Sequence, residues 1–397
     1  MAAESTLTTK VVRKIEEIPY RDWESVFPKA LENYEFFKSL DASNFDQFKF
    51  FYIVIYDNGA AVGATSCFLM RFPFDMTVQG PTKTVLLPLK KLFPNILSPK
   101  VLVCGLPMGQ GRIGIARDTD RIMQAICAGM EKIAKEERAV GLLFKDFIET
   151  YDSVLSPLLK KGFFKVESLP STDMDITFSS FDDYLKKLSP ASREGLKRKF
   201  KKVDGQVKID FEAKNLLSQE ELSQVYGLYL QTFEKQDLGL EKLPEDFFGN
   251  ASKNMPQEAK FFLWRIEGRL VAFAFCLVSG GHFIDYYLGF DYAVAHQYNL
   301  YFIRFRDLLK WCIANGIKKY EMGVTTYESK RRLGFNFIRL YFYVKHRNPL
   351  VNPFAKLLTQ FIKPENFDPI FKEMNKGLQP IDSAAAARPI FSSTQKI

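Results

Sequence analysis

The pattern of apolar and polar positions is most informative in the second half of the chain. Residues 282–290 are rich in aromatic side chains, which is typical of a strand buried on both faces. Between 298 and 313 apolar residues recur at helical spacing, and Asn315-Gly316 supplies a left-handed stop. A strand is expected over 318–323. A short helix is expected over 325–334, capped by the two threonines with which this segment begins.

The first half shows the same order of elements: strand, loop, long helix, strand, short helix, a Gly-Phe pair and a strand. These elements are expected at 101–106, 119–137, 139–146 and 150–161, with Gly162-Phe163 leading into the last strand. A hairpin precedes each set, at 48–71 and at 261–278, and the turn at 57–59 has the Asp-Asn-Gly sequence typical of hairpins. The shared order predicts an internal repeat.

The chain is therefore expected to consist of two similar halves. Residues 1–175 form the N-terminal half, 176–205 basic connecting helices, 206–350 the C-terminal half, and 351–397 a C-terminal helix and a frayed tail. Residues 72–100 contain five prolines and several lysines among apolar residues. They predict a mobile apolar flap, a membrane-contact element, or a long insertion packed on the domain.

Composition adds an excess of positive charge and of phenylalanine. The formal net charge of +9 favours anionic partners such as CoA, RNA, an acidic carrier protein or anionic lipid, although it also serves ordinary solubility. The 38 Phe residues, against 3 Trp, leave room for an apolar groove or a membrane-facing patch.

Cysteine usage and apolar run lengths bear on the compartment. The five cysteines show no CxxC spacing, which favours buried thiols in a reducing compartment, and three histidines without ligand spacing argue against a metal site. The N-terminus lacks the apolar segment of a signal peptide. The most hydrophobic segment, 270–278, is too short for a membrane span, which needs about 20 apolar residues. We expect a cytoplasmic protein that can lie peripherally at the inner face of the membrane.

The segment GQGRIG at 109–114 fits the dinucleotide fingerprint, between a predicted strand and a predicted helix. A Rossmann site requires an acid about 20 residues further on, at the end of the next strand. Here that strand ends at Asp146, 32 residues after the motif, and the preceding hairpin does not suit a parallel sheet. NAD is therefore not favoured, but such a turn can hold another ligand's pyrophosphate. The cofactor-binding candidates on this basis are Gly109, Gln110, Gly111, Arg112 and Gly114.

A basic helix is expected after Ser189, which serves as its cap, with Pro190 in its first position. Six lysines and arginines lie between 193 and 202. They could hold an RNA backbone, as a transferase that uses aminoacyl-tRNA would require. They could instead bind CoA phosphates, an acidic carrier protein or anionic lipid, or simply form a solvated linker helix.

The element order, together with the stretches LPMGQGRIGIA, LLFKDF, GIKKYEMG and TYESKRRLGF, resembles the GNAT acyltransferase fold. The doubled order is similar to the Fem-like and BioF2-like branch over about residues 45–345. This resemblance implies an α/β fold with two central mixed sheets flanked by helices. The usual glycine-bearing GNAT loop is absent from 291–299, so which half binds the donor, and whether the donor is CoA, stay open.

The chemistry that the resemblance implies is transfer of an acyl group from a thioester, on CoA or an acyl carrier protein, to an amine. Such a transfer needs a base, an oxyanion donor and an acid for the leaving group. We expect Asp285 or Glu321 as the base, Tyr327 as the acid, and Lys330 as the partner of a phosphate or carboxylate of the ligand. No tightly bound cofactor is expected.

Substrate contacts are expected from the strand at 282–290 and from the end of the equivalent strand in the first half. Strand alternation places Asp285 and Tyr287 on one face and Tyr286 on the other. The substrate-binding candidates are Tyr286, Tyr287, His282, Lys145 and Asp146. Each also has a structural interpretation: core aromatics, an edge histidine, and an ion pair.

The functional hypothesis is an N-acyltransferase acting in lipid metabolism on a long-chain acyl group or lipid amine, in a ceramide-synthase-like role. The abundance of Phe and the lysine-flanked apolar stretch within 85–100 motivate this substrate class. One alternative is a Fem-type peptidyltransferase that carries an amino acid from tRNA to a cell-wall precursor. Another is a non-catalytic binding protein on the same fold.

Overall fold

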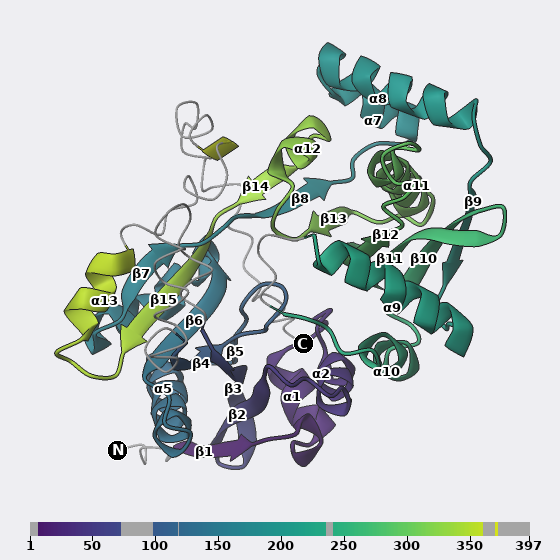
Figure 1. Ribbon diagram of the computed structural model, residues 1–397. Helices are drawn as coiled ribbons and strands as arrows, with labels where there is room; N and C mark the ends of the chain where they lie inside the picture. Colours follow the sequence, from purple (N-terminus) through teal and green to yellow (C-terminus); the bar gives the residue numbers. More distant parts are fainter. Residues whose placement is uncertain (1–6, 73–97, 118, 236–240, 360–369, 372–397) are drawn as a thin grey trace, which may run out of the picture.

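The computed structural model describes residues 7–72, 98–117, 119–235, 241–359 and 370–371. Two mixed β-sheets lie side by side, and helices cover their faces (Figure 1). The expected segment 72–100 falls mostly outside the described residues, as does the expected tail. Among the residues that are described, no helix is both long and apolar enough to cross a membrane.

The first sheet has the strand order β1-β2-β3-β4-β6-β15-β7, with the short β5 paired to β3. Its strands are β1 (Leu7–Val12), β2 (Lys49–Asp57), β3 (Ala60–Arg71), β4 (Lys100–Cys104), β5 (Gly114–Ile115), β6 (Gly141–Ile148), β7 (Phe164–Glu167) and β15 (Leu340–His346). The predicted hairpin is β2–β3, and its turn has Asn58 and Gly59 in the left-handed region.

The second sheet has the order β14-β8-β13-β12-β11-β10-β9. Its strands are β8 (Ser171–Asp175), β9 (Asp210–Lys214), β10 (Ala259–Ile266), β11 (Arg269–Ser279), β12 (His282–Phe290), β13 (Lys319–Met322) and β14 (Asn336–Ile338). In each sheet the central pair is parallel, β4 with β6 and β12 with β13, and the preceding hairpin is antiparallel.

Helices flank both sheets. They are α1 (Tyr20–Val26), α2 (Tyr34–Ala42), α5 (Thr119–Glu136), α6 (Asp152–Leu155), α7 (Phe181–Lys187), α8 (Pro190–Asp204), α9 (Gln219–Phe233), α10 (Phe247–Asn254), α11 (Leu300–Ala314), α12 (Tyr327–Arg332) and α13 (Asn352–Thr359), with the 3₁₀ helices η1 (Ile15–Glu17), η3 (Glu149–Tyr151) and η4 (Ser156–Lys161). The Ser189 cap is confirmed. The threonine cap of α12 is wrong: Thr325 and Thr326 have positive φ angles, and the Thr326 side chain makes no capping hydrogen bond.

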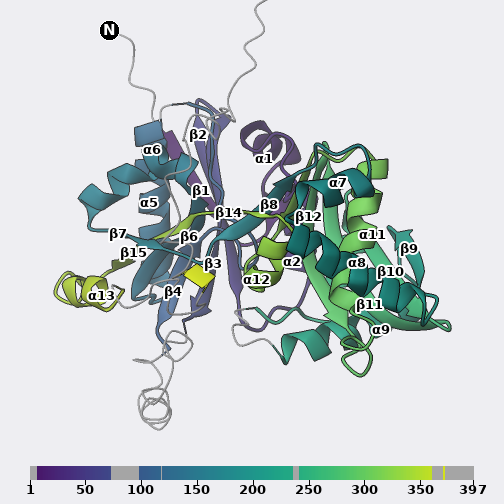
Figure 2. The ribbon, with the colours of Figure 1, turned by 90° about the horizontal axis from the view of Figure 1, so that it is seen from above.

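The internal repeat is visible in the strand orders. Read from opposite ends, the sheets correspond position by position, with β7, β15, β6 and β4 matching β14, β8, β13 and β12. The second position of each sheet is filled by a strand from the other half of the sequence. Thus β8 lies in the second sheet and β15 in the first, and Figure 2 shows β8 and β14 passing between the two lobes. The expected division at 175 and 206 did not include this exchange.

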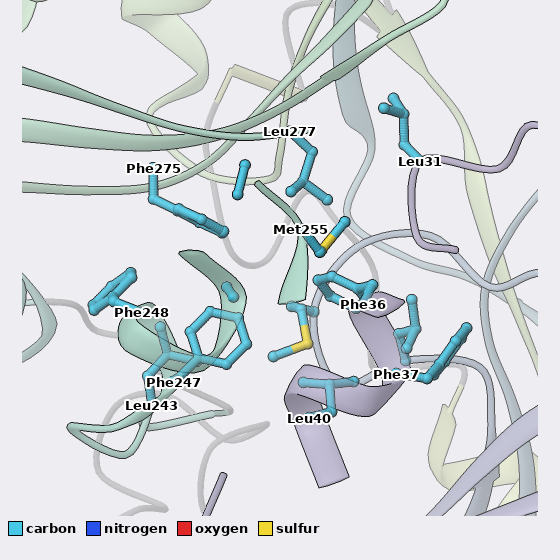
Figure 3. Packing of buried hydrophobic residues seen from close by; sticks show 14 of the residues in the cluster. Leu31, Phe36, Phe37, Leu40, Leu243, Phe247, Phe248, Met255, Phe275 and Leu277 are labelled. Atoms are coloured by element: carbon cyan, nitrogen blue, oxygen red, sulfur yellow. The ribbon is translucent and has the colours of Figure 1, made fainter. Parts of the chain in front are cut away.

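The two halves also share a hydrophobic core. One cluster of buried side chains extends from α2 to α9, α10 and β11. Figure 3 shows Phe36 and Leu40 of α2 brought together with Phe247 and Met255 at the other half. Asn250 of α10 donates a hydrogen bond of 3.0 Å to Ser43 Oγ at the end of α2. Apolar burial therefore holds together the elements on either side of the interface between the sheets.

Candidate active site

A cavity of about 500 Å³ lies between the two halves. Its walls come from β4, β6, β7 and β15 on one side, from β12, α11 and α12 on the other, and from the loop at 107–110. The sequence-predicted residues that line it are Gly109, Gln110, Lys145, Asp146, Asp285, Tyr286, Tyr287, Glu321 and Lys330. Those that do not are Gly111, Arg112, Gly114, His282 and Tyr327.

The cavity reaches into an opening between two strands of the second sheet. β12 and β13 are paired as far as Asp285 and Met322 and then separate. Beyond this point Tyr287 on one side and Val324 on the other line the cavity. The separated parallel strands form a slot, open on the cavity side.

The equivalent position of the first sheet is filled by its own loop. β4 and β6 are paired as far as Cys104 and Phe144. The loop then folds back, and the Gly111 N–H donates a 3.0 Å hydrogen bond to the carbonyl of Asp146. A Cβ on Gly111 would lie 2.2 Å from the Lys145 carbonyl oxygen, so this glycine permits close packing of backbone on backbone. The open slot therefore belongs to the second half.

A β-bulge in β12 determines which side chains face the cavity. Cys276 pairs with Asp285 and Phe275 with Tyr287, so Tyr286 is an extra residue. The expected alternation is therefore wrong. Tyr286 and Tyr287 both pack against the core cluster on the cavity side, whereas the carboxylate of Asp285 points toward α11 on the opposite face.

Tyr286 connects the two halves through a buried carboxylate. Its hydroxyl donates a 2.8 Å hydrogen bond to Glu32 Oε1, and Arg112 pairs with the other oxygen at 2.9 Å. Burial raises the pKa of Tyr286 well above its ordinary value, so the phenol stays protonated. The loop backbone passes close by, since a Cβ on Gly109 would lie 2.8 Å from the Tyr286 hydroxyl. Arg112 and Gly109 thus have structural partners within the protein.

Glu241 is a cavity carboxylate that sequence reasoning missed. The Tyr287 hydroxyl donates a 3.3 Å hydrogen bond to Glu241 Oε1. Burial raises the pKa of Glu241 to about 7, an effect that the nearby Lys145 charge and the Tyr287 hydrogen bond only partly offset. Glu241 forms no ion pair with any residue that the structure describes. A partly buried carboxylate of this kind can accept a proton near neutral pH.

Glu321 is held from both halves. Gln110 Nε2 donates a 2.7 Å hydrogen bond to Oε1, and His282 Nε2 lies 3.2 Å from Oε2. His282 therefore contacts the Glu321 carboxylate but does not line the cavity. Glu321 remains a candidate base, with both oxygens already in contact with neighbouring side chains.

Asp285 belongs to a fully buried ion pair. Arg304 Nη1 donates at 2.6 Å and the Tyr320 hydroxyl at 2.9 Å to the same carboxylate oxygen. The Asp285 carboxylate raises the pKa of the Arg304 guanidinium, although burial opposes this. These partners indicate that Asp285 balances the buried charge of Arg304 on the α11 side of the second sheet.

Lys330 and Tyr327 lie on α12 but occupy different environments. Lys330 Nζ donates to the carbonyls of Gly323 and Val324, where β13 ends, and it lines the cavity. Burial lowers the pKa of this amine to about 7. The Tyr327 hydroxyl instead donates a 2.9 Å bond to the Pro170 carbonyl, away from the cavity lining.

Lys145 and Asp146 meet at the rim of the filled slot. Their side chains pair at 2.5 Å, and the Ser168 hydroxyl donates a 2.6 Å bond to the other Asp146 oxygen. Asp146 adopts a left-handed backbone conformation, with φ 57°. Both readings made from the sequence apply, because these residues line the cavity and also form a structural ion pair.

Comparisons with known proteins agree with this geometry. Residues 190–331, which contain β12, β13 and the open slot, match the family described as an acetyltransferase (GNAT) domain. FemX is similar in structure, with 12% sequence identity and a TM-score of 0.55, over 88% of this chain and 100% of that chain. L-PGS from Bacillus licheniformis has 13% sequence identity and a TM-score of 0.51, over 87% of this chain and 96% of that chain. The tandem GNAT protein from the clavulanic acid biosynthesis pathway has 11% sequence identity and a TM-score of 0.50, over 87% of this chain and 99% of that chain.

Residues 190–331 are thus similar in sequence to the GNAT acetyltransferase domain, and the fold of the whole chain resembles those of FemX and the tandem GNAT protein.

Curated relatives also match in sequence. Proteins named 8-amino-7-oxononanoate synthase 2, from two strains of Mycobacterium tuberculosis, are 24% identical over 325 residues. The match covers 79% of this chain and 42% of each relative, so the chain spans about two fifths of the length of these relatives.

The cavity has an apolar wing, which we define as Phe72, Val101, Leu143, Val166, Phe342 and Val344. The wing lies on the sheet face of β4, β6, β7 and β15 that is opposite α5. It contrasts with the polar end, where Glu32, Glu241, Glu321 and Lys330 converge. The cavity can therefore hold a ligand with one polar, reactive end and one apolar end.

Glu32 and Glu241 could not be located by motif. Glu32 precedes α2 and Glu241 precedes α10, in loops without distinctive spacing. They reach the cavity because α2 and α10 pack together across the shared core. Among the described residues no group of three His, Cys, Asp or Glu side chains could hold a metal ion.

Proposed function

We propose that this protein is an N-acyltransferase that takes an acyl group from a thioester in the slot of its second half and transfers it to an amine bound in the cavity. The observation that carries the proposal is the open slot between β12 and β13, in a cavity that has a polar end bearing Glu241 and Lys330 and an apolar wing. The matched GNAT family supports the reaction class.

In the proposed reaction the amine nitrogen attacks the thioester carbonyl carbon. Glu241 accepts the proton that the nitrogen loses as the new C–N bond forms. Its pKa of about 7 suits it to this work near neutral pH, and the Tyr287 hydroxyl holds the carboxylate in place. Glu321 is the second candidate for the same role, fixed by Gln110.

Collapse of the tetrahedral intermediate breaks the C–S bond and releases a thiolate, which needs a proton. Lys330 lies against the carbonyls that end β13, at one side of the slot, and with a pKa of about 7 it gives up a proton readily. We assign the donation to Lys330 because the Tyr327 hydroxyl is committed to Pro170. The ammonium form of Lys330 also stabilises negative charge on the intermediate.

The donor can be acyl-CoA or an acyl carrier thioester. The loop before α11 lacks glycine, and the amides of Val294 and Ala295 donate to the Asp291 carbonyl. These amides are not free to hold a pyrophosphate, which favours donors whose recognition does not depend on this loop. The apolar wing supports a long acyl chain or a lipid amine as substrate, including a ceramide-synthase-like pairing.

The test is turnover by the purified full chain. Short- and long-chain acyl-CoA and acyl carrier thioesters are offered with a sphingoid base or another long-chain amine, and the released thiol and the amide product are measured. We expect long-chain amide product. The absence of turnover with every thioester would overturn the proposal and leave a non-catalytic binding protein as the better description.

A second candidate is the aminoacyl-tRNA-dependent transfer of Fem-type enzymes. The observation in its favour is the exposed basic face of α8, where Lys197, Arg198, Lys201 and Lys202 point to solvent. RNA that co-purifies with the protein, is released by nuclease, and can donate an amino acid in a transfer assay would favour this reading over the thioester one.

A further inference from the structure

Large apolar side chains are exposed together at α13. Leu350 is 79% exposed, Phe354 67% and Leu357 53%. Val351, Val140 and Leu159 are exposed beside them, and most of the exposed large hydrophobic residues that the structure describes belong to this group. The contacts are close: Arg347 N–H donates to the Val140 carbonyl, and Asn352 Nδ2 donates 2.8 Å to the Gly162 carbonyl just after Leu159. We call Val140, Leu159, Leu350, Val351, Phe354 and Leu357 the α13 patch.

The helix presents these residues in one direction because its other side is anchored. Asn352 accepts a 2.7 Å hydrogen bond from the His346 N–H of β15, in addition to donating to Gly162. Phe354 and Leu357 lie three residues apart, on one helical face, and Leu350 and Val351 lead into the first turn. A soluble helix normally buries such a face.

Lysines that have no acidic partner among the described residues lie beside the patch. Lys160 and Lys161 precede Gly162 and are exposed, and Lys356 is exposed on α13 itself. None of the three forms an ion pair with a residue that the structure describes. The neighbouring Lys345 and Arg347 differ, since both pair with Glu131 at 3.0 Å. Apolar side chains bordered by unpaired cations match an anionic lipid surface.

The helix at the centre of the patch also reaches the cavity. Thr359, the last residue of α13, lines the cavity, and so do Phe342 and Val344 of the β15 strand that carries the helix. The helix that carries most of the α13 patch therefore also borders the cavity at its last residue. Figure 1 shows α13 at the outer edge of the first sheet, beside β15 and β7.

We propose that α13 docks on an anionic membrane surface, with its apolar face at the boundary of headgroups and acyl chains and Lys160, Lys161 and Lys356 at the lipid phosphates. Docking in this orientation brings the apolar wing to the lipid surface. The proposal concerns binding alone and holds whether or not the protein transfers acyl groups.

The test is co-sedimentation of the full chain with phosphatidylcholine vesicles that do or do not contain phosphatidylglycerol. We expect binding to the anionic vesicles that weakens with salt. The double variant Phe354→Ser/Leu357→Ser should bind at least about tenfold more weakly, because it removes the two large apolar side chains that would enter the lipid surface. Leu216→Ser is the matched control, since Leu216 is 71% exposed in the β9–α9 loop, and it should bind as the wild type does.

A second variant tests the charge. Lys160→Glu/Lys161→Glu changes only exposed residues, so folding is retained, and it should lose binding to anionic vesicles by about tenfold or more at low salt. Unchanged vesicle binding by both double variants would overturn the proposal. So would a concentration-dependent dimer that Phe354→Ser/Leu357→Ser abolishes in light scattering, because a second copy of the chain would then cover the patch.

Discussion

The charged residues around the cavity separate into two kinds. Glu32 and Asp285 each have an arginine partner, Arg112 and Arg304, and their charges are balanced within the protein. Glu241 and Lys330 have no oppositely charged partner in an ion pair among the described residues. Burial moves the pKa of each to about 7. Unbalanced titratable groups of this kind are those expected to move protons in a reaction.

Glu241→Gln should lower kcat/KM by about 10²- to 10⁴-fold, since a general base contributes on that order. In the wild type, the pH profile should be bell-shaped around pH 7, because activity needs the carboxylate form of Glu241 and the ammonium form of Lys330. The variant should lose the rising limb of this profile. Glu245→Gln, four residues on and exposed, is the control and should retain both rate and profile. A wild-type pH profile in the Glu241 variant would assign the base elsewhere, with Glu321 next.

Lys330→Met should change the pH dependence of stability. The folded pKa of about 7 lies below that of a free lysine, so the unfolded chain binds more protons between pH 7 and about 10.4. The free energy of unfolding of the wild type should therefore rise with pH across this window, at up to about 1.4 kcal/mol per pH unit from this residue. Urea unfolding of both proteins at several pH values should show the rise in the wild type and a flatter curve in the variant.

Asp285→Asn should destabilise the protein by about 3–5 kcal/mol, because it leaves the Arg304 charge buried without its partner. The double variant Asp285→Leu/Arg304→Met removes both charges and should recover part of the loss. Glu328→Gln, which breaks exposed pairs on α12, should change stability by about 1 kcal/mol or less. An Asp285→Asn protein that is stable but inactive would restore Asp285 as the catalytic base.

At the scale of elements, local irregularities decide where function resides. The bulge in β12 turns Tyr286 and Tyr287 toward the cavity together, and the glycine-rich loop fills one slot while the other stays open. The motif at 109–114 looked like a phosphate cradle in sequence. In the fold the segment is a closely packed loop, which places Gln110 within hydrogen-bond distance of Glu321 and Gly109 against Tyr286.

Gly111→Ala tests this loop. Its Cβ would lie 2.2 Å from the Lys145 carbonyl, and backbone at that distance must move. We expect a fall in melting temperature and a loss of activity as Gln110 is displaced from Glu321. Gly195→Ala in α8 is the matched control with the opposite sign, because no atom lies within 4 Å of its added Cβ and alanine stabilises a helix by about 0.5–1 kcal/mol. Equal stability of Gly111→Ala and the wild type would contradict the close packing.

At the scale of the whole molecule, the halves are not separable units. Each sheet contains a strand from the other half, β8 in the second and β15 in the first, and the core between α2 and α10 is continuous. The cavity lies at this junction, so its walls depend on correct assembly of both sheets.

A chain that ends at residue 338 should fail to fold its first sheet, although the missing strand is far from that sheet in sequence. Without β15, the edges of β6 and β7 have no partner and the apolar wing loses Phe342 and Val344. We expect aggregation, or rapid proteolysis within residues 100–170. A chain that ends at Phe371 retains every described residue and should stay soluble; if the chain ending at 338 were equally soluble and resistant, the strand exchange would not be needed for folding.

Residue order alone determined the element types, the repeat and the superfamily resemblance, because apolar periodicity and turn residues are local signals. Hairpins β2–β3 and β10–β11, helices α5 and α11, and the parallel strands β6 and β13 follow from such signals. The sequence also placed Lys330, Glu321 and Tyr287 among the site candidates, and all three line the cavity.

Tertiary structure alone decided which slot is open, which face Asp285 occupies and which cavity carboxylate has no ion-pair partner among the described residues. Each of these depends on contacts between residues far apart in the chain, such as Tyr286 with Glu32, Gln110 with Glu321, and Tyr287 with Glu241. A one-residue bulge reverses strand faces without a mark in composition, and two strands change sheets through pairing that no local pattern records. Burial, which sets the proton affinity of Glu241 and Lys330, exists only when both halves are assembled.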